Sequence, residues 1–245
     1  MRPIAALISL LLAMTAASFW AEEAESILTK IDAYRIPYRD FLIRTKITSF
    51  EHDEEKETAL FDVYVSGLNK SLAIAKKYRT RGMKILYVDE NMWVQLPNTH
   101  RPIRITPIQR LLGEASNGDI AMVSFAEDYE AEDTGPQKVE GTNCRRLLLS
   151  AKKKSATYHK IVLYVREGDF RPVKAEFYLL SGKHFKTAYY TEFKPFDGKV
   201  LLSKMLIVDE QQKWKKTAIE TISIEPVTLP ARYFSKNNLV HIQGL

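Results

Sequence analysis

From residue 39 onwards, apolar residues recur at every second position, and short turn sequences interrupt this alternation. Within 59–65, for example, the side chains of Phe61, Val63 and Val65 lie on one face of an extended chain. Short turns such as Asp197-Gly198 join antiparallel strands, because parallel neighbours need a long crossover connection. The chain is therefore predicted to fold mainly into antiparallel β-structure.

The predicted strands fall into an earlier and a later group. They are expected at residues 59–65, 70–79, 83–88, 92–96, 139–151, 158–166, 171–180, 184–193, 200–209 and 214–225. Because a flat sheet of that many strands is unusual, we expect one highly curved antiparallel sheet. The fold class is mainly β, with a few helices (α+β).

Residues 22–34 carry a helical pattern. Ile31 follows Ile27 by four residues and Leu28 by three, a spacing that predicts an amphipathic helix. Pro37 prevents its continuation, since proline disfavours a helical conformation in the residue before it. The apolar stripe of this N-terminal amphipathic helix is expected to pack on the sheet.

A second helical region lies between the two groups of strands. Thr106, Pro107 and Gln109 form the pattern of a capping box with proline at the first helical position, so a short helix is expected over 106–113. Another short helix is expected from Asn117 to about residue 125. Two short helices of this kind can form a lid over one face of the sheet.

The first 21 residues are organised like a secretory signal peptide. One positive charge at Arg2 precedes an apolar run over 4–17, and small residues follow between Ala17 and Ala21. This run is shorter than the roughly 20 residues that a membrane-spanning helix needs. Since no cysteine lies near these cleavage positions, lipid attachment there is not expected. We predict a cleaved signal peptide (1–21) and a single exported domain (22–245).

Composition and motifs argue against an enzyme. With 45% hydrophobic and 27% charged residues over 245 positions, the chain has an ordinary globular composition. It contains no G-x-S-x-G elbow, glycine-rich phosphate loop or H-E-x-x-H motif. A single cysteine, Cys144, excludes a thiolate zinc site and an internal disulfide, and its apolar neighbours predict a buried structural thiol. No catalytic residue, metal or cofactor is predicted.

The net charge of the chain is +6. For an exported protein this charge points to anionic lipid or acidic protein surfaces rather than to nucleic acid, although a solvated basic surface explains it equally well. The lysine-rich runs 152–154 and 213–216 are candidates for contact with an anionic membrane. Asp128, Glu130 and Glu132 alternate along a predicted strand, which favours a solvated face over a metal site.

Several strands carry apolar residues on both faces, unlike an antiparallel sheet with one solvated face. The second face is covered either by the helices, as ordinary core, or by a ligand, and periodicity alone does not separate the two. A concave apolar surface suits acyl chains, because each buried methylene contributes about 0.8 kcal/mol without a polar partner. The candidate cavity and lid residues are Met92, Trp93, Leu96, Ile108, Leu111, Leu112, Met122 and Phe125, and the candidate polar rim is Arg101, Arg104 and Arg110.

Three stretches occur in an order and spacing typical of one known family. The first reads Met-Trp-Val-Gln-Leu-Pro at 92–97, followed by Arg-Pro-Ile-Arg-Ile at 101–105. The second reads Gln-Arg-Leu-Leu-Gly at 109–113, with Gly118-Asp119, Tyr129 and Gly141 after it. The third reads Arg-Pro-Val-Lys-Ala-Glu-Phe-Tyr at 171–178, with Ser-Gly-Lys at 181–183. Over nearly the whole mature chain the sequence resembles the LolA-like, outer-membrane lipoprotein-sorting family.

The resemblance implies a half-open β-barrel with short helices as a lid over an apolar cavity, in a periplasmic protein. It implies a carrier that binds lipoprotein acyl chains or other lipids and passes them towards the outer membrane. The alternative is a ligand-binding or sensing accessory module of a membrane transporter of the resistance-nodulation-division type, with no transport of its own. Many relatives have a Met-Gly-Ser-Asp-Phe-like lid where this chain reads Leu-Gly-Glu-Ala-Ser at 112–116, so lipoprotein is not preferred over free lipid. We expect a monomer that binds no nucleic acid.

Overall fold

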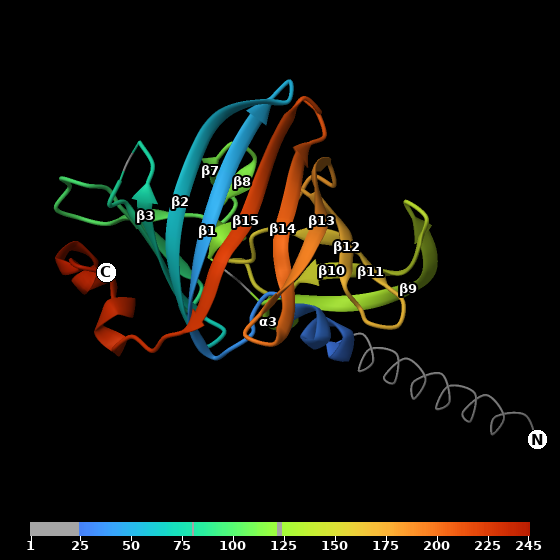
Figure 1. Ribbon diagram of the computed structural model, residues 1–245, viewed down its shortest axis with the longest axis horizontal. Coiled ribbons are helices and arrows are strands. Elements are labelled where there is room, and N and C mark those ends of the chain that lie inside the picture. Colours follow the sequence, from blue (N-terminus) through green and yellow to red (C-terminus); the bar gives the residue numbers. More distant parts are fainter. Residues whose placement is uncertain (1–24, 80, 122–123) are drawn as a thin grey trace, which may run out of the picture.

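The computed structural model describes residues 25–79, 81–121 and 124–245, and these residues fold mainly into β-strands. In this part of the chain thirteen strands form one sheet, in the order β6-β5-β4-β3-β2-β1-β15-β14-β13-β12-β11-β10-β9. All neighbouring pairs are antiparallel, and Figure 1 shows the sheet curving around its inner face. The expected highly curved antiparallel sheet is confirmed. It is not closed into a barrel, because the edge strands β6 and β9 do not pair with each other.

Two meanders build this sheet, the first containing β1 to β6 and the second β9 to β15. Within each meander, strands adjacent in sequence are also adjacent in space, as short turns favour. The bounds are β1 (Asp40–Glu51), β2 (Glu54–Ser66), β3 (Lys70–Lys77), β4 (Lys84–Val88), β5 (Asn91–Gln95), β6 (Ile103–Ile105), β9 (Tyr129–Val139), β10 (Thr142–Ala151), β11 (Lys160–Arg166), β12 (Pro172–Tyr178), β13 (His184–Phe196), β14 (Lys199–Asp209) and β15 (Lys215–Pro226).

The meanders join through β1 and β15, where Ile47 lies opposite Ile219. The register of β1 shifts after Arg44 against β15 and after Ser49 against β2. Such bulges bend a strand and increase its twist. They contribute to the curvature that turns the long central strands around the interior of the molecule.

Residues 25–32 are helical and pack on the concave face of the sheet. The side chains of Ile27, Leu28 and Ile31 are at most 1% exposed and belong to the main core. Just after the helix, Tyr34 O accepts a hydrogen bond from Leu202 N of β14 at 2.8 Å. The expected amphipathic helix is confirmed for its described part, while residues 22–24 and the predicted signal peptide at 1–21 lie outside the described residues.

The prediction of a helix over 106–113 is wrong. Residues 107–109 form a turn, and Arg110–Leu112 (β7) pairs with Ala115–Ser116 (β8) in a separate two-stranded sheet. Gly113 has a φ of +54° and lies in the turn that joins these strands. The Leu-Gly-Glu segment is therefore a hairpin turn rather than the end of a helix.

Backbone hydrogen bonds explain this difference. Gly118 N donates to Pro107 O at 2.9 Å. Asn117 N donates to Gln109 O at 3.0 Å. In a helix, each of these two carbonyls would instead accept a hydrogen bond from the N–H four residues later. One half of the capping box is present, because Thr106 N donates to Gln109 Oε1 at 2.9 Å. This local contact closes a turn but does not start a helix.

The second expected helix is replaced by two single-turn helices, α2 (Asn117–Ile120) and α3 (Phe125–Asp128). Ser116, rather than Asn117, is the N-cap of α2, and its backbone N donates to Asp119 Oδ2 at 2.8 Å. Residues 122–123, between the two helices, lie outside the described residues. The prediction of short helices here is thus correct in kind, but the continuous helix is not formed.

Two smaller predictions have opposite outcomes. Asp128 does not share a solvated face with Glu130 and Glu132, because it ends α3, is 4% exposed and lies 3.3 Å from Lys153 Nζ. Glu130 and Glu132 are exposed on the edge strand β9. The buried position expected for Cys144 is confirmed in β10, and burial raises the pKa of its thiol.

The outer apolar face of the first meander is covered by the C-terminal segment. Two 3-10 helices, η1 (Ala231–Phe234) and η2 (Lys236–His241), pack on this face at the side opposite the concave interior. The buried residues of this outer cluster are Leu42, Tyr64, Leu72, Ile74, Leu86, Phe234, Leu239 and Ile242. In the first meander the chain itself therefore covers the second apolar face.

Candidate functional site

The concave face of the sheet is closed by a small insertion between the two meanders. We call residues 110–121 and 124–128, which contain β7, β8, α2 and α3, the lid. Its apolar residues Leu112, Ile120 and Phe125 are 2–6% exposed and belong to the same core cluster as the inner face of the sheet. Figure 1 shows β7 and β8 lying behind the long central strands, on their concave side. The lid and the sheet thus enclose one apolar interior.

The tip of the β7–β8 hairpin touches the sheet closely. A Cβ atom on Gly113 would lie 2.3 Å from Thr217 Oγ1 and 2.8 Å from Ser49 Cβ. The next residue, Glu114, donates its backbone N–H to Thr217 Oγ1 at 2.7 Å. The positive φ of Gly113 and this close approach both require glycine, so the hairpin can seat directly on β1 and β15.

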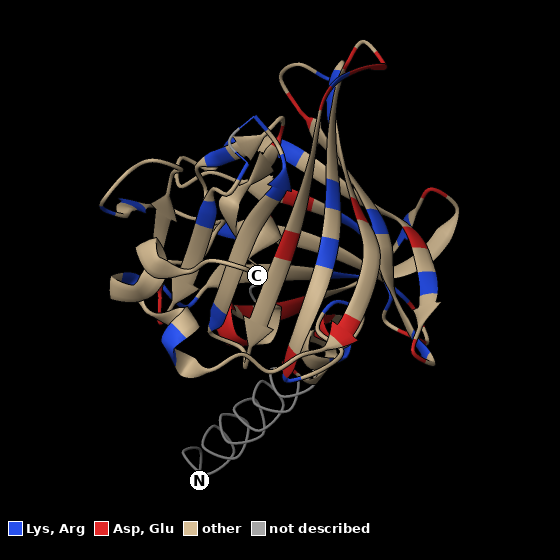
Figure 2. Cartoon of the chain, turned by 60° about the vertical axis from the view of Figure 1, so that its left-hand side comes forward, with Lys and Arg blue, Asp and Glu red and all other residues tan. Residues whose placement is uncertain are grey.

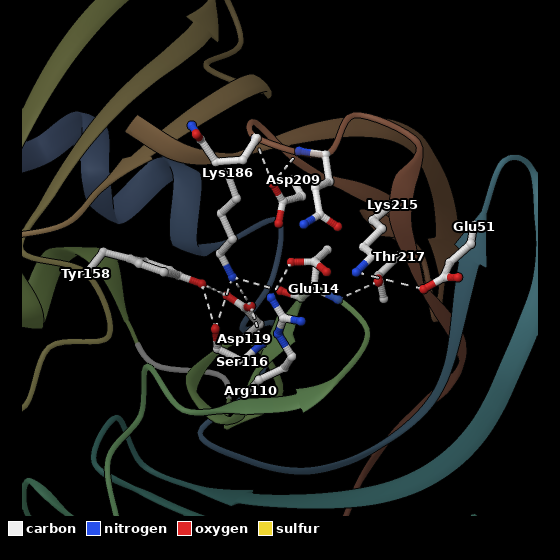
Figure 3. Close-up of polar contacts among 12 residues, drawn as sticks. Glu51, Arg110, Glu114, Ser116, Asp119, Tyr158, Lys186, Asp209, Lys215 and Thr217 are labelled. Carbon is white, nitrogen blue, oxygen red and sulfur yellow. Dashed lines mark hydrogen bonds and ion pairs between the residues drawn. The ribbon is translucent and has the colours of Figure 1, made fainter. Parts of the chain in front are cut away.

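Lys186 of β13 holds the middle of the lid (Figure 3). Its Nζ donates to Asp119 Oδ2 at 2.9 Å, to Ser116 Oγ at 3.0 Å and to Glu114 O at 3.1 Å. The Lys186 side chain is 2% exposed and that of Asp119 is 7% exposed. An ammonium has three N–H donors, and here each has an acceptor in the lid. Both partners of this ion pair between lid and sheet are therefore buried.

Burial sets the electrostatics around Lys186. It lowers the pKa of the Lys186 ammonium, whereas the adjacent Asp119 carboxylate opposes that shift. Tyr158 donates to Asp119 Oδ1 at 2.6 Å, and burial raises the pKa of Tyr158 well above its ordinary value. The Nζ atom also lies 4.7 Å from the centre of the Tyr158 ring and 5.5 Å from that of Phe177. The cation is thus surrounded by one carboxylate, two further lid oxygens and aromatic rings.

The 3.0 Å separation between Ser116 Oγ and Lys186 Nζ equals that of a nucleophile and its general base. In this site, however, Lys186 Nζ also lies 2.9 Å from Asp119 Oδ2 and 3.1 Å from Glu114 O. Ser116 is also only 4% exposed. These contacts join the lid to β13.

Asp32, at the end of the helical residues 25–32, holds the other end of the lid. Its carboxylate accepts hydrogen bonds from Ser124 Oγ at 2.6 Å and from the backbone N–H groups of Phe125 and Ala126 at 3.0 Å. These amides belong to the first turn of α3, where a helix has no internal acceptors. The Arg35 guanidinium lies 3.5 Å from Asp32 Oδ1 and 4.5 Å from the centre of the Phe125 ring. A second buried charge thus fixes α3.

A small cavity of about 50 Å³ lies between the lid and the sheet. It is lined by Arg35, Ile43, Thr45, Asp119, Ile120, Leu202, Ser203, Lys204, Met205, Ile219, Thr221 and Ile224. Ligand pockets of known proteins measure about 300–1,000 Å³, so this cavity is too small for a whole lipid while the lid is closed. Side chains of the lid and of helical residues 25–32 fill the remaining concave face.

Two larger grooves border the segment that leads into the lid. The first, of about 700 Å³, includes Met92, Arg104, Ile108 and Lys154 in its lining. The second, of about 490 Å³, includes Tyr78, Met83, Arg110 and Leu111. Ile105 and Gln109 line both grooves, so the two lie on either side of the 105–109 segment. These volumes fall within the range of ligand pockets.

The candidate cavity residues are distributed over three places. Met92 and Ile108 line the first groove, and Leu111 lines the second. Leu112 and Phe125 are buried residues of the lid itself, and Leu96 packs against the same core from just after the end of β5. Trp93 does not face the interior, because adjacent residues of a strand point to opposite faces and it packs on the outer cluster with the C-terminal segment. Met122 lies outside the described residues.

The candidate rim arginines do not form one cluster. Arg104 donates to Asn91 Oδ1 at 2.6 Å in the first groove. Arg110 is paired with Glu114 at 3.0 Å at the base of the hairpin, and Arg101 is exposed. The structure therefore brings Arg104 and Arg110 to opposite sides of the 105–109 segment.

The lysine-rich runs are largely neutralised. Lys152 lies 3.1 Å from Glu25, and Lys216 lies 2.7 Å from Asp53. Lys153, Lys213 and Lys215 are paired with Asp128, Glu210 and Glu51. Figure 2 shows basic and acidic residues interspersed along the outer strands. Five lysines of the two runs thus take part in ion pairs.

Sequence reasoning missed Lys186, Asp119 and Asp32 as site residues. A usable signal exists for Lys186, because it alternates in phase with the buried Ala188 and Tyr190 along β13. A lysine on the buried face of a strand needs a partner. The identity of that partner, 67 residues away in sequence, depends on the tertiary structure.

No helix of the described chain is long and apolar enough to cross a membrane. Within residues 25–79, 81–121 and 124–245, no group of three or more His, Cys, Asp or Glu side chains is placed to hold a metal ion.

Comparisons with known proteins place the chain in a family through a solved structure. A family model described as an uncharacterized protein matches residues 67–241. No curated protein matches the chain. Among solved structures, a LolA superfamily protein from Nitrosomonas europaea is 30% identical with a TM-score of 0.81, over 87% of this chain and 98% of that one.

Two further structures show the same fold at lower identity. A DUF1329 family protein from Desulfovibrio piger is 20% identical with a TM-score of 0.76, and the match covers 90% of this chain and 99% of that one. A domain described as an outer membrane lipoprotein-sorting protein, from Vibrio parahaemolyticus, is 22% identical with a TM-score of 0.74 over the same shares of the two chains.

Proposed function

The chain belongs to the LolA superfamily, and from this premise we propose that it is a periplasmic carrier that holds the acyl chain of a lipid or lipoprotein beneath its lid. The observation that carries the proposal is the apolar interior between lid and sheet. Leu112, Ile120 and Phe125 of the lid cover a concave sheet face whose cavity is lined by further apolar side chains. Burial of an acyl chain there would replace contacts that the lid now makes.

Lid movement is required for this function. The closed cavity of about 50 Å³ holds no complete acyl chain, whereas the grooves beside residues 105–109 reach 490 and 700 Å³. The lid is a short insertion whose one-turn helices have little stability of their own. Its attachment depends on packing and on contacts of Lys186 and Asp32, which are few enough to break and re-form. Lid displacement would join the cavity to one of these grooves.

Binding is tested with residues 22–245 and the neutral fluorescent probe N-phenyl-1-naphthylamine. We expect saturable binding, displacement by unlabelled lipid, and co-purified lipid in native mass spectrometry. Met205→Glu, which places a charge in the cavity lining, should weaken probe binding by about tenfold or more. Ile222→Glu, at an exposed position of β15, is the matched control and should bind normally. Absence of both saturable binding and bound lipid would contradict the proposal.

Transfer separates a carrier from an accessory module. We expect the mature chain to accelerate movement of a fluorescent phospholipid from donor to acceptor vesicles, in proportion to protein concentration. Ligand binding without any acceleration would instead favour the sensing or accessory role beside a membrane transporter.

A further inference from the structure

Lys186 is attached to the lid in an unusual way. It belongs to β13 of the sheet, yet all three oxygen acceptors that the described residues offer to its Nζ belong to the lid. On its other sides the ammonium meets the rings of Tyr158, Phe177 and Phe185, at 4.7–5.8 Å. When the lid moves, this cation loses every oxygen partner together.

We propose that the ligand carries an anionic head group, a carboxylate or a phosphate, which takes the place of the Asp119 carboxylate on Lys186 when the lid opens. This inference rests on the proposed carrier function and names the class of ligand: an anionic amphiphile rather than a neutral one. Lys186 would be the polar anchor of a site that otherwise recognises only hydrocarbon.

The energetic argument concerns the open lid. A buried charge deprived of its partner is strongly destabilising, so opening is unfavourable unless water or another anion reaches Lys186. A ligand shifts an equilibrium only by its differential affinity for the two states. An anionic head group satisfies the ammonium only in the open state, because Asp119 occupies that position in the closed one. A neutral lipid of equal length provides no such replacement.

The geometry provides space for the tail beside this anchor. Asp119 lines the small cavity, so movement of its carboxylate enlarges the cavity at the end nearest Lys186. The cavity continues along apolar residues of β14 and β15, among them Leu202, Met205 and Ile219. A head group on Lys186 would therefore leave its hydrocarbon tail against the concave sheet face.

Competition against N-phenyl-1-naphthylamine tests this inference with palmitate and hexadecanol, which have equal chain lengths. For the wild-type chain we expect palmitate to displace the probe at a concentration lower by about tenfold or more. Lys186→Met should abolish this preference without weakening hexadecanol, and Lys186→Arg should retain it. Lys174→Met, which removes a partly buried lysine of β12 paired with Glu176, is the control and should keep the preference.

Asp119→Asn provides a second variant with the ammonium intact. Loss of the competing carboxylate should strengthen palmitate binding relative to hexadecanol, which is the reverse of the effect of Lys186→Met. Circular dichroism of each variant checks folding, and the opposite signs of the two effects cannot arise from a general loss of structure.

Further competitors in the same experiment distinguish an anionic amphiphile from a free anion. Hexadecyl phosphate should compete as palmitate does, whereas acetate and inorganic phosphate, which have no tail, should not displace the probe. Displacement of the probe by these small anions at the same concentrations would contradict the inference that the ligand is an amphiphile. It would instead indicate a site for a free anion. Equal displacement by palmitate and hexadecanol would overturn this inference and leave the carrier function standing. Failure of every lipid to displace the probe would instead count against the carrier function itself.

Discussion

Two glycines of the lid lie where no side chain fits. A Cβ atom on Gly118 would lie 1.9 Å from Thr157 Oγ1, and one on Gly113 would lie 2.3 Å from Thr217 Oγ1. Gly118 brings α2 against the loop before β11, and Gly113 brings the hairpin tip against β1 and β15. At the scale of single residues, the closed lid therefore depends on the absence of two side chains as much as on the charges that hold it.

This dependence predicts the effect of Gly113→Ala. The added Cβ must displace Thr217 or Ser49, so we expect a loss of unfolding free energy about 1–3 kcal/mol larger than for Gly182→Ala. Gly182 is the matched control, because its φ of +81° carries similar backbone strain but its Cβ would meet open space. Urea unfolding monitored by fluorescence measures both variants. Equal losses of unfolding free energy in the two variants would show that backbone strain alone explains why position 113 requires glycine.

At the scale of elements, strand β5 contributes side chains to two separate apolar clusters, one on each face of the sheet. Met92 faces the concave core, whereas the adjacent Trp93 faces the outer cluster beneath the C-terminal 3-10 helices. The C-terminal segment has no period-two or helical pattern, yet Phe234, Leu239 and Ile242 are 0–7% exposed. It stabilises the first meander by covering a face that would otherwise be apolar and solvated.

Leu239→Ala tests this role of the C-terminal segment. Leu239 is fully buried, so its truncation should lower the unfolding free energy by about 2–5 kcal/mol and shift the emission of Trp93 to longer wavelength. Leu180→Ala, at a leucine that is 79% exposed, should change stability by less than about 0.5 kcal/mol. Chemical denaturation followed by tryptophan emission measures both. A Leu239 variant as stable as the Leu180 variant would show that the segment covers the sheet without stabilising it.

At the scale of the whole molecule, three parts far apart in sequence meet at the lid. Helical residues 25–32 contribute Asp32, the second meander contributes Lys186, and the lid itself is the insertion between the meanders. The sheet is a continuous hydrogen-bonded ladder, whereas the hydrogen bonds of the lid to β13 and β15 involve side chains. The lid should therefore open locally while the sheet stays folded.

Hydrogen exchange measured by mass spectrometry tests this independence. Asp32→Ala removes the acceptor of three hydrogen bonds from Ser124, Phe125 and Ala126, so lid amides should exchange about tenfold faster or more. Amides of β1 and β15 should keep their protection. Asp197→Ala, which removes an exposed hydrogen bond to Tyr38, is the control and should leave the lid unchanged. Equal acceleration in lid and sheet would mean that they unfold together.

The sequence by itself determined ten of the thirteen strands of the described sheet, their antiparallel order and the helix around Ile27, Leu28 and Ile31, but it did not predict β1, β6 or β9. These features depend on the alternation of side chains and on short turns, which act between near neighbours. The same local reasoning placed a helix at 106–113, where Pro107 and Gln109 in fact bond to residues of α2.

Only the tertiary structure decided which segment covers each apolar face and which charges pair. Trp93 is covered by a segment more than a hundred residues further along the chain, and Lys186 meets Asp119 through the curvature of the sheet. Such contacts stabilise the protein only after the chain between the partners has been ordered, so no local pattern encodes them. For this reason the apolar character of the interior was readable from the sequence, whereas the charged anchors of its lid were not.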